Sequence, residues 1–95
     1  MLKPSDNASE MVEPPLLQAG DYDTAIQDAA AALTSNPEGS KLKERLADAY
    51  INRAWYYKAK RLNTYAGADL FKAIEIAPGY YRAHYELGRL SLIHI

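Results

Sequence analysis

The sequence predicts an all-α protein of about four helices, and three observations lead to this fold class. Apolar residues recur at intervals of three and four over most of the chain, the spacing that places them on one face of a helix. No segment alternates apolar and polar residues with period two, so no strands are expected. All five prolines fall before residue 38 or at Pro78, which leaves Leu42 to Ala77 free of this helix breaker.

Composition narrows the class of protein further. Of the 95 residues, 48% are hydrophobic and 24% are charged, and the net charge is −1, as in ordinary globular domains. The chain lacks the basic excess of a nucleic-acid binder, any apolar run near membrane-spanning length, and the apolar core of a secretory signal. The absence of cysteine excludes disulfides, thiolate metal sites and cysteine nucleophiles. We therefore expect a cytoplasmic protein with no membrane and no nucleic-acid partner.

The helical domain is expected to begin after a polar N-terminal segment. Residues 1–15 carry three prolines and are expected to be extended or disordered, so the helical domain covers 16–95. The stretch GDYDTAI, residues 20–26, has the composition of a turn that leads into a helix. Asp21 or Asp23 is expected to cap that helix.

Four helices are expected in order along this domain. They run from Tyr22 to Ser35, from Ser40 to about Arg61, from about Tyr65 to Ala77, and from Tyr80 onward. Asn-Pro and Pro-Gly dipeptides end the first and third helices. Asn63 is the only turn-forming residue between the second and third helices, so a loop is expected near Arg61 to Thr64.

The two helix-ending prolines, Pro37 and Pro78, bring two halves of the chain into alignment. Alanine stands twelve residues before each proline. A second alanine stands five residues before each proline, and a larger aliphatic residue directly follows it. Small residues recur where two helices approach closely. The alignment therefore predicts close helix–helix contacts at Ala25, Ala66 and Ala73.

These offsets resemble the tetratricopeptide repeat (TPR), a helix–turn–helix unit of about 34 residues. GDYDTAI resembles the stretch that joins the two helices of that repeat. Leu46-Ala47, with Tyr50 after it, and Leu87-Gly88 resemble the Leu-Gly pair of its first helix. The resemblance covers about residues 20–92. It implies antiparallel helical hairpins stacked as a short, TPR-like, right-handed solenoid.

The chain departs from that family in three ways. The prolines are 41 residues apart, and we expect the excess mostly before Asn63, in a long first helix of the central hairpin. Pro14 and Pro15 fall where the first repeat should have its first helix, and the chain ends at SLIHI without a helix to cover the last one. Because a repeat cannot bury its apolar face alone, we expect a homodimer by mutual completion or a need for another neighbour, unless PPLLQA covers part of the gap.

Several residues invite a chemical interpretation beside a simpler structural one. Trp55-Tyr56-Tyr57 forms either an aromatic platform for a ligand or, with Tyr57 turned inward, part of the hairpin packing. His84 is expected to pack, because it has no carboxylate or cysteine partners at metal-ligand spacing. Asp28 is expected to be solvated. Acidic residues, including Glu44 and Asp48, interrupt a basic run and should form pairs within the helix. The run comprises Lys41, Lys43, Arg45, Arg53, Lys58, Lys60 and Arg61.

The resemblance implies a non-enzymatic protein–protein interaction or scaffold module, without a cofactor and without catalytic or metal-ligating residues. In the family, first-helix residues line a concave groove that binds a peptide or partner protein. The matching positions here are Lys41, Glu44, Arg45, Asp48, Asn52, Arg82, Tyr85, Glu86 and Arg89. Glu44 and Asp48 stand where the family's carboxylate clamp needs lysine and asparagine, so that clamp is not expected. Three alternatives stay open: a regulatory or structural segment of a larger enzyme or signalling protein, a basic nucleic-acid-binding face, and a plain solvated surface.

Overall fold

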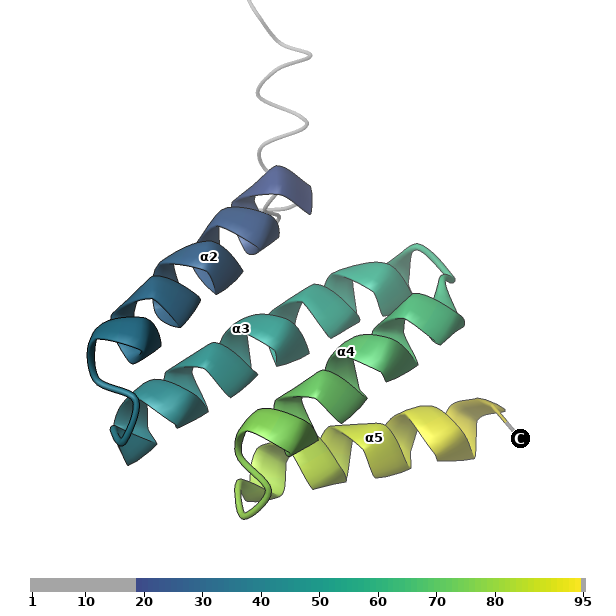
Figure 1. Cartoon of the computed structure of the whole chain (residues 1–95). Coiled ribbons are helices and arrows are strands. Elements are labelled where there is room, and N and C mark those ends of the chain that lie inside the picture. Colours follow the sequence, from purple (N-terminus) through teal and green to yellow (C-terminus); the bar gives the residue numbers. More distant parts are fainter. Residues whose placement is uncertain (1–18, 95) are drawn as a thin grey trace, which may run out of the picture.

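The structure is a computed structural model that describes the backbone of residues 19–94 and the side chains of residues 20–90. Its helices are α2 (Ala19–Ser35), α3 (Ser40–Ala59), α4 (Asn63–Ile76) and α5 (Tyr81–His94) (Figure 1). Residues 19–94 contain no strand, so the all-α class with four helices is confirmed for this part of the chain. The segment 1–15 and the expected domain start at residue 16 lie outside the described residues.

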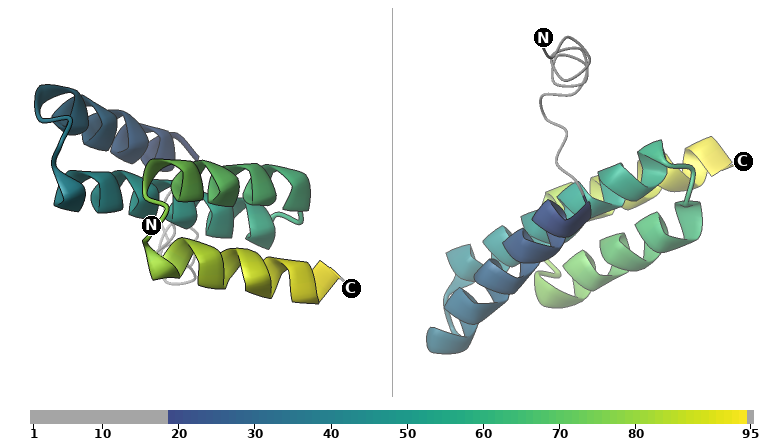
Figure 2. Two further views of the ribbon diagram at one scale, coloured as in Figure 1. Left: turned by 60° about the horizontal axis from the view of Figure 1, so that its bottom comes forward. Right: turned by 90° about the horizontal axis from the view of Figure 1, so that it is seen from above.

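The four helices form an open row. The α3–α4 hairpin lies in the middle, α2 packs against α3, and α5 packs against α4 and less extensively against α3. Figures 1 and 2 show α2 and α5 on opposite sides of the hairpin. Within residues 19–94 the backbone of α2 approaches neither α4 nor α5, which distinguishes this row from a closed four-helix bundle.

The row is built from two copies of one helix–loop–helix unit. Helix α2 ends at Ser35 and α4 at Ile76, while α3 begins at Ser40 and α5 at Tyr81, so both boundaries recur after 41 residues. The connecting loops also share a hydrogen bond. The Gly39 N–H donates to the Asn36 carbonyl in one loop, and the Tyr80 N–H donates to the Ala77 carbonyl in the other, both at 3.0 Å. The alignment on Pro37 and Pro78 therefore describes a real structural repeat.

Small side chains allow the helices of the central hairpin to approach closely. Ala66 is 1% exposed and Ala73 is fully buried, in a core that also holds Ile51 and Leu70. Both positions agree with the sequence prediction. The prediction for Ala25 was wrong, because this residue is exposed on α2 and no described helix lies against that face.

The extra length of the central hairpin lies in α3, as expected. This helix runs unbroken for 20 residues, whereas α4 has 14, which corresponds to lengths of about 30 Å and 21 Å. The turn between them was placed slightly too late, since α4 already begins at Asn63. The residue that turns the chain is Arg61, with φ of 64°. The Leu62 N–H donates to Tyr57 and the Arg61 N–H to Lys58, which is the Schellman pattern of a helix end.

The expected turn at the start of α2 is not observed. Gly20 and Asp21 already lie within the helix, and Asp23 lies a full turn from its first described residue. Asp23 is therefore not a cap. It accepts a hydrogen bond from Nη1 of Arg53 at 2.8 Å and so links α2 to α3.

Arg53 joins three helices through one guanidinium group. In addition to its bond to Asp23, it donates from Nε and Nη2 to the two carboxylate oxygens of Asp69 in α4, at 2.9 and 2.8 Å. The same group lies 5.6 Å from the ring centroids of both Tyr50 and Tyr57. Asp69 is only 5% exposed, and its hydrogen bond raises the pKa of Arg53 further above its usual high value, against the opposing effect of burial. A charge pair of this kind fixes how α3 and α4 are aligned.

Candidate partner-binding face

The predicted groove residues lie on α3, in the middle of the row, and on α5, which packs partly against it. Two of the α3 residues, Asp48 and Asn52, meet Arg82 of α5: its Nη1 donates to Asp48 Oδ1 at 2.7 Å and its Nη2 to the Asn52 side-chain oxygen at 3.4 Å. Among the described residues, no hydrogen bond or ion pair joins Lys41 or Glu44 to α5. The structure therefore brings together only part of the predicted set here.

Asp48 serves mainly to hold the start of α5 against α3. In addition to Arg82, the hydroxyl of Tyr80 donates to both carboxylate oxygens, at 2.9 and 3.1 Å. This hydrogen bond, with partial burial and the negative charge of Asp48, raises the pKa of the Tyr80 hydroxyl. The expected pairing of Asp48 within its own helix is not observed, because its partner comes from α5.

Further along α5, aromatic rings and cations form a continuous ladder. The rings of Tyr81 and Tyr85, one helical turn apart, stack with centroids 5.7 Å apart. The guanidinium of Arg89, a turn further on, lies 5.8 Å from the Tyr85 ring and 5.2 Å from the Trp55 ring of α3. On the same indole, the Lys58 ammonium lies 4.5 Å from the ring centroid. We call these five residues the cation–aromatic strip.

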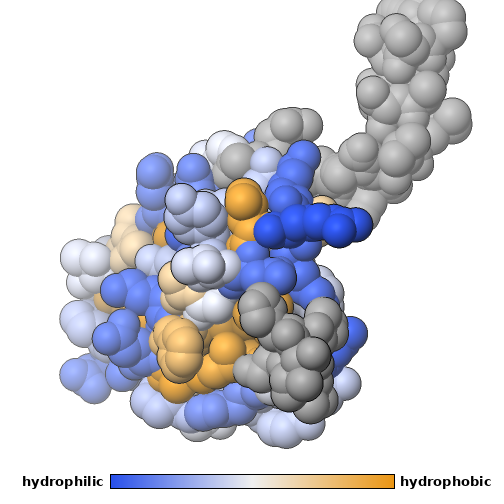
Figure 3. Space-filling model, turned by 90° about the vertical axis from the view of Figure 1, so that its right-hand side faces the viewer, coloured by the Kyte–Doolittle hydropathy of each residue, from blue (hydrophilic) through white to orange (hydrophobic). Residues whose placement is uncertain are grey.

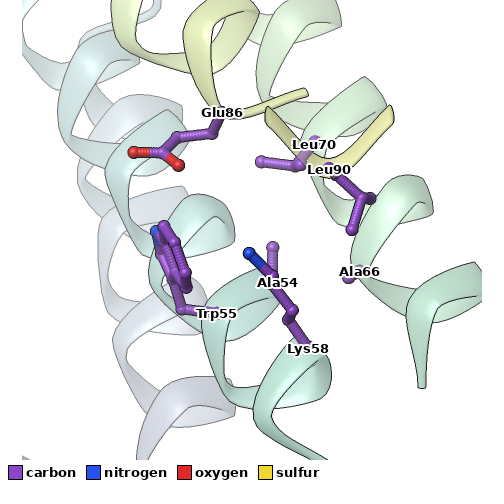
Figure 4. A pocket seen from close by; sticks show the side chains of 7 residues that line it. All are labelled: Ala54, Trp55, Lys58, Ala66, Leu70, Glu86 and Leu90. Atoms are coloured by element: carbon purple, nitrogen blue, oxygen red, sulfur yellow. The ribbon is translucent and has the colours of Figure 1, made fainter. Parts of the chain in front are cut away.

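A small pocket lies beside this strip, between α3, α4 and α5 (Figure 4). Its lining residues are Ala54, Trp55, Lys58, Ala66, Leu70, Glu86 and Leu90. Figure 4 shows Glu86 and Trp55 on one side and the leucines and Ala66 on the other, with the Lys58 amine directed into the space between them. About 10 Å³ remains, roughly the room of one water molecule. Figure 3 shows an apolar area edged by hydrophilic residues on the side where α5 ends.

A much larger hollow, of about 330 Å³, lies on the other flank of α3, against α2. Its lining residues are Ala25, Asp28, Ala29, Arg45, Asp48, Ala49 and Asn52. Arg45, Asp48 and Asn52 were predicted to face the same groove as the α5 residues. The structure places Arg45 toward α2 and Tyr85, Glu86 and Arg89 on α5, while Asp48 and Asn52 both line the hollow and hydrogen-bond to Arg82 of α5.

The remaining candidates have separate roles. Trp55, Tyr56 and Tyr57 do not share one set of contacts. Trp55 meets Arg89 of α5, whereas the Tyr56 and Tyr57 rings lie 5.8 Å from each other, with Tyr22 5.3 Å from Tyr56 and Tyr65 5.4 Å from Tyr57. The prediction that the His84 ring is packed against other residues was wrong. Its ring is exposed, with Nε2 2.7 Å from the Pro78 carbonyl oxygen.

Sequence reasoning missed Tyr80 and Lys58 as parts of this face. The residue 41 positions before Tyr80 is Gly39, so the repeat alignment carried no signal for a side chain there. Lys58 was counted in a basic run, but its amine lies on Trp55, three residues before it on the same helix. That spacing, typical of neighbours on a helix surface, could have indicated the contact.

The face offers hydrogen-bonding cations and exposed rings for recognition. Among the side chains that the structure describes, those of residues 20–90, no three histidine, cysteine, aspartate or glutamate groups are placed to hold a metal ion. The same described residues contain no helix of the length and hydropathy needed to cross a bilayer. Comparisons with protein-family models, curated proteins and solved structures find no match to this chain.

Proposed function

We propose that this chain is a non-enzymatic, cytoplasmic protein-interaction module that binds a peptide or partner protein across α3 and α5. In this proposal the two 41-residue units are TPR-like repeats that form a short right-handed solenoid. The exact recurrence of helix ends and the open row of neighbouring contacts support this interpretation.

The observation that carries the proposal is the cation–aromatic strip. Tyr85 is 48% exposed and Tyr81 72%, and their rings stack into one contiguous exposed aromatic surface, a feature that marks interaction sites. Arg89 lies between Tyr85 and Trp55, which restricts its conformations before binding. Tryptophan, tyrosine and arginine dominate the residues that carry binding energy at interfaces, and restricted side chains lose less entropy on association.

A second candidate is a structural segment of a larger enzyme or signalling protein. It is favoured by the mutual contacts of Asp48, Asn52 and Arg82, which use predicted groove residues to hold α5 in place. A structural segment would bind no separate ligand through Tyr85 and Arg89.

Selection from a displayed peptide library tests the two candidates. Peptides selected on the wild-type chain should bind the Tyr85→Ala/Arg89→Ala double variant at least about tenfold more weakly, because hot-spot truncations commonly cost 2 kcal/mol or more. The matched control is Phe71→Ala, which removes an exposed ring (62% exposed) from α4. Peptides that depend on Phe71 and not on the strip, or the absence of any selected peptide, would contradict the proposal.

A further inference from the structure

The small pocket and the large hollow occupy equivalent places in the two repeat units. Four lining positions of one recur in the other after 41 residues. The pairs are Ala25 with Ala66, Ala29 with Leu70, Arg45 with Glu86, and Ala49 with Leu90. Each space therefore has the same location in its unit, at the junction between the two helices.

The two spaces differ in whether a third helix closes them. In the α4–α5 unit, α3 supplies Ala54, Trp55 and Lys58, which close the space to about 10 Å³. In the α2–α3 unit no described helix occupies that position, and about 330 Å³ stays open. Ala25 is correspondingly exposed where Ala66 is buried. The molecule therefore contains a filled and an open version of one helix-binding site.

We propose that the open hollow between α2 and α3 docks an amphipathic helix of a partner protein, and that this helix carries a basic residue for Asp28. Asp28 stands 41 residues before Asp69, whose carboxylate is held by both Nε and Nη2 of Arg53. Asp28 is exposed, and no ion pair reaches it from the described side chains of residues 20–90. A partner arginine in the position of Arg53 would make the same paired hydrogen bonds.

The rim of the hollow specifies a second charge on the partner. Lys58 lines the small pocket together with Glu86, and the residue equivalent to Glu86 in the hollow is Arg45. A lysine in the place of Lys58 would therefore approach a like charge. The docking helix should instead carry an acidic residue five positions after its arginine, with alanine and a large aromatic residue directly following the arginine.

The chain's own leading sequence does not have this pattern. The residues 41 positions before Arg53, Trp55 and Lys58 are Val12, Pro14 and Leu17, which offer neither the cation nor the aromatic ring. This makes a separate partner helix the better match in charge.

A synthetic peptide with the α3 sequence, Ser40–Ala59, is the natural probe, because α3 fills the equivalent site. Binding of a fluorescein-labelled peptide to the full chain is measured by fluorescence anisotropy. The Lys58→Glu peptide should bind several-fold more tightly than the unaltered peptide. Asp28→Arg in the protein should weaken binding by about tenfold or more, the usual range for a lost hydrogen-bonded charge. Pairing that variant with an Arg53→Asp peptide should restore affinity.

Two control variants distinguish the hollow from the rest of the protein surface. Ala31→Glu places a charge on another exposed position of α2, equivalent to exposed Lys72, and should leave the affinity unchanged. Tyr85→Ala/Arg89→Ala should also leave it unchanged, so this inference and the proposed function can fail separately. The inference is overturned if no peptide binds at about 1 mM, if charge reversal on both sides does not restore affinity, or if Ala31→Glu is as damaging as Asp28→Arg. It is also overturned if Asp28→Arg dissociates oligomers of the chain and no peptide binds, because the occupant is then a second copy.

Discussion

The α2–α3 and α4–α5 units share helix ends, loop hydrogen bonds and buried positions, yet equivalent residues have different surroundings. Ala29 and Leu70, 41 residues apart, are both buried, in core clusters that include residues of the helix that follows each in the chain. Asp28 and Asp69 are also 41 residues apart, but Asp28 is exposed and Asp69 is held by Arg53. The difference arises from α3, which covers α4, whereas no described helix covers the matching face of α2. A repeated sequence position thus fixes where a side chain points, and the neighbouring helix decides whether it is buried.

The largest expected difference between the two units concerns these aspartates. Asp69→Ala leaves the partly buried Arg53 with the exposed Asp23 as its one remaining ion-pair partner among the described residues, and should lower the free energy of unfolding by about 3 kcal/mol. Asp28→Ala, at the equivalent exposed site, should change it by less than about 0.5 kcal/mol. Urea unfolding followed by circular dichroism measures both values. Equal effects would show that the two faces are covered alike.

The second comparison uses Ala66 and Ala25. Ala66→Leu forces a larger side chain between α3 and α4 and should cost about 1–3 kcal/mol. Ala25→Leu, at the exposed equivalent, should be nearly neutral. Thermal unfolding of the two variants in parallel provides the measurement. An unchanged melting curve for Ala66→Leu would contradict the tight packing of the central hairpin.

The sequence allowed the helices and their repeat to be predicted, because both depend on local signals. Pro37 and Pro78 mark the helix ends, and the breaker-free segment before Asn63 indicated the long α3. The loop was expected at Arg61 to Thr64 because Asn63 is the only turn-forming residue there. The residue that turns the chain is Arg61, in a backbone conformation that glycine or asparagine adopts more readily than arginine.

The candidate site was predicted less well, because its contacts depend on which helices become neighbours. The positions of Tyr85 and Arg89 on α5 followed from the repeat, but the contact of Arg89 with Trp55 required the placement of α5 beside α3. The same holds for Asp48, whose ion pair with Arg82 joins residues 34 positions apart. No pattern within one helix reports such a pair.

A third comparison concerns small residues in equivalent places on α3 and α5. Ala47 is fully buried, whereas a Cβ atom added to Gly88, 41 residues later, would meet nothing within 4 Å apart from its own helix. Gly88→Ala should therefore stabilise the protein by about 0.5–1 kcal/mol through helix propensity alone. Ala47→Gly should destabilise it by about 1 kcal/mol or more, since contacts are lost as well. Both free energies of unfolding are measured in urea. If Gly88→Ala were destabilising, α5 would have a close neighbour on that face.

The smallest expected effect on the free energy of unfolding concerns a difference between the two connecting loops. Tyr80 bonds Asp48 at the start of α5, whereas the equivalent loop residue, Gly39, has no side chain to do so. Because the bond is only partly buried, Tyr80→Phe should lower the free energy of unfolding by only about 0.5 kcal/mol at pH 7. The pKa of Tyr80 is raised in the folded protein, so folding favours its protonated form. This contribution is fully present below the unfolded pKa of about 10 and is lost as the pH rises through the higher folded pKa. The difference in the free energy of unfolding between wild type and Tyr80→Phe should therefore shrink in alkaline solution.

Chemical unfolding at pH 7 and at about pH 11 gives this difference at each pH. Tyr81→Phe is the control, because Tyr81 is the neighbouring, more exposed tyrosine. A difference that is constant with pH, or that Tyr81→Phe reproduces, would show that the bond to Asp48 does not hold the start of α5.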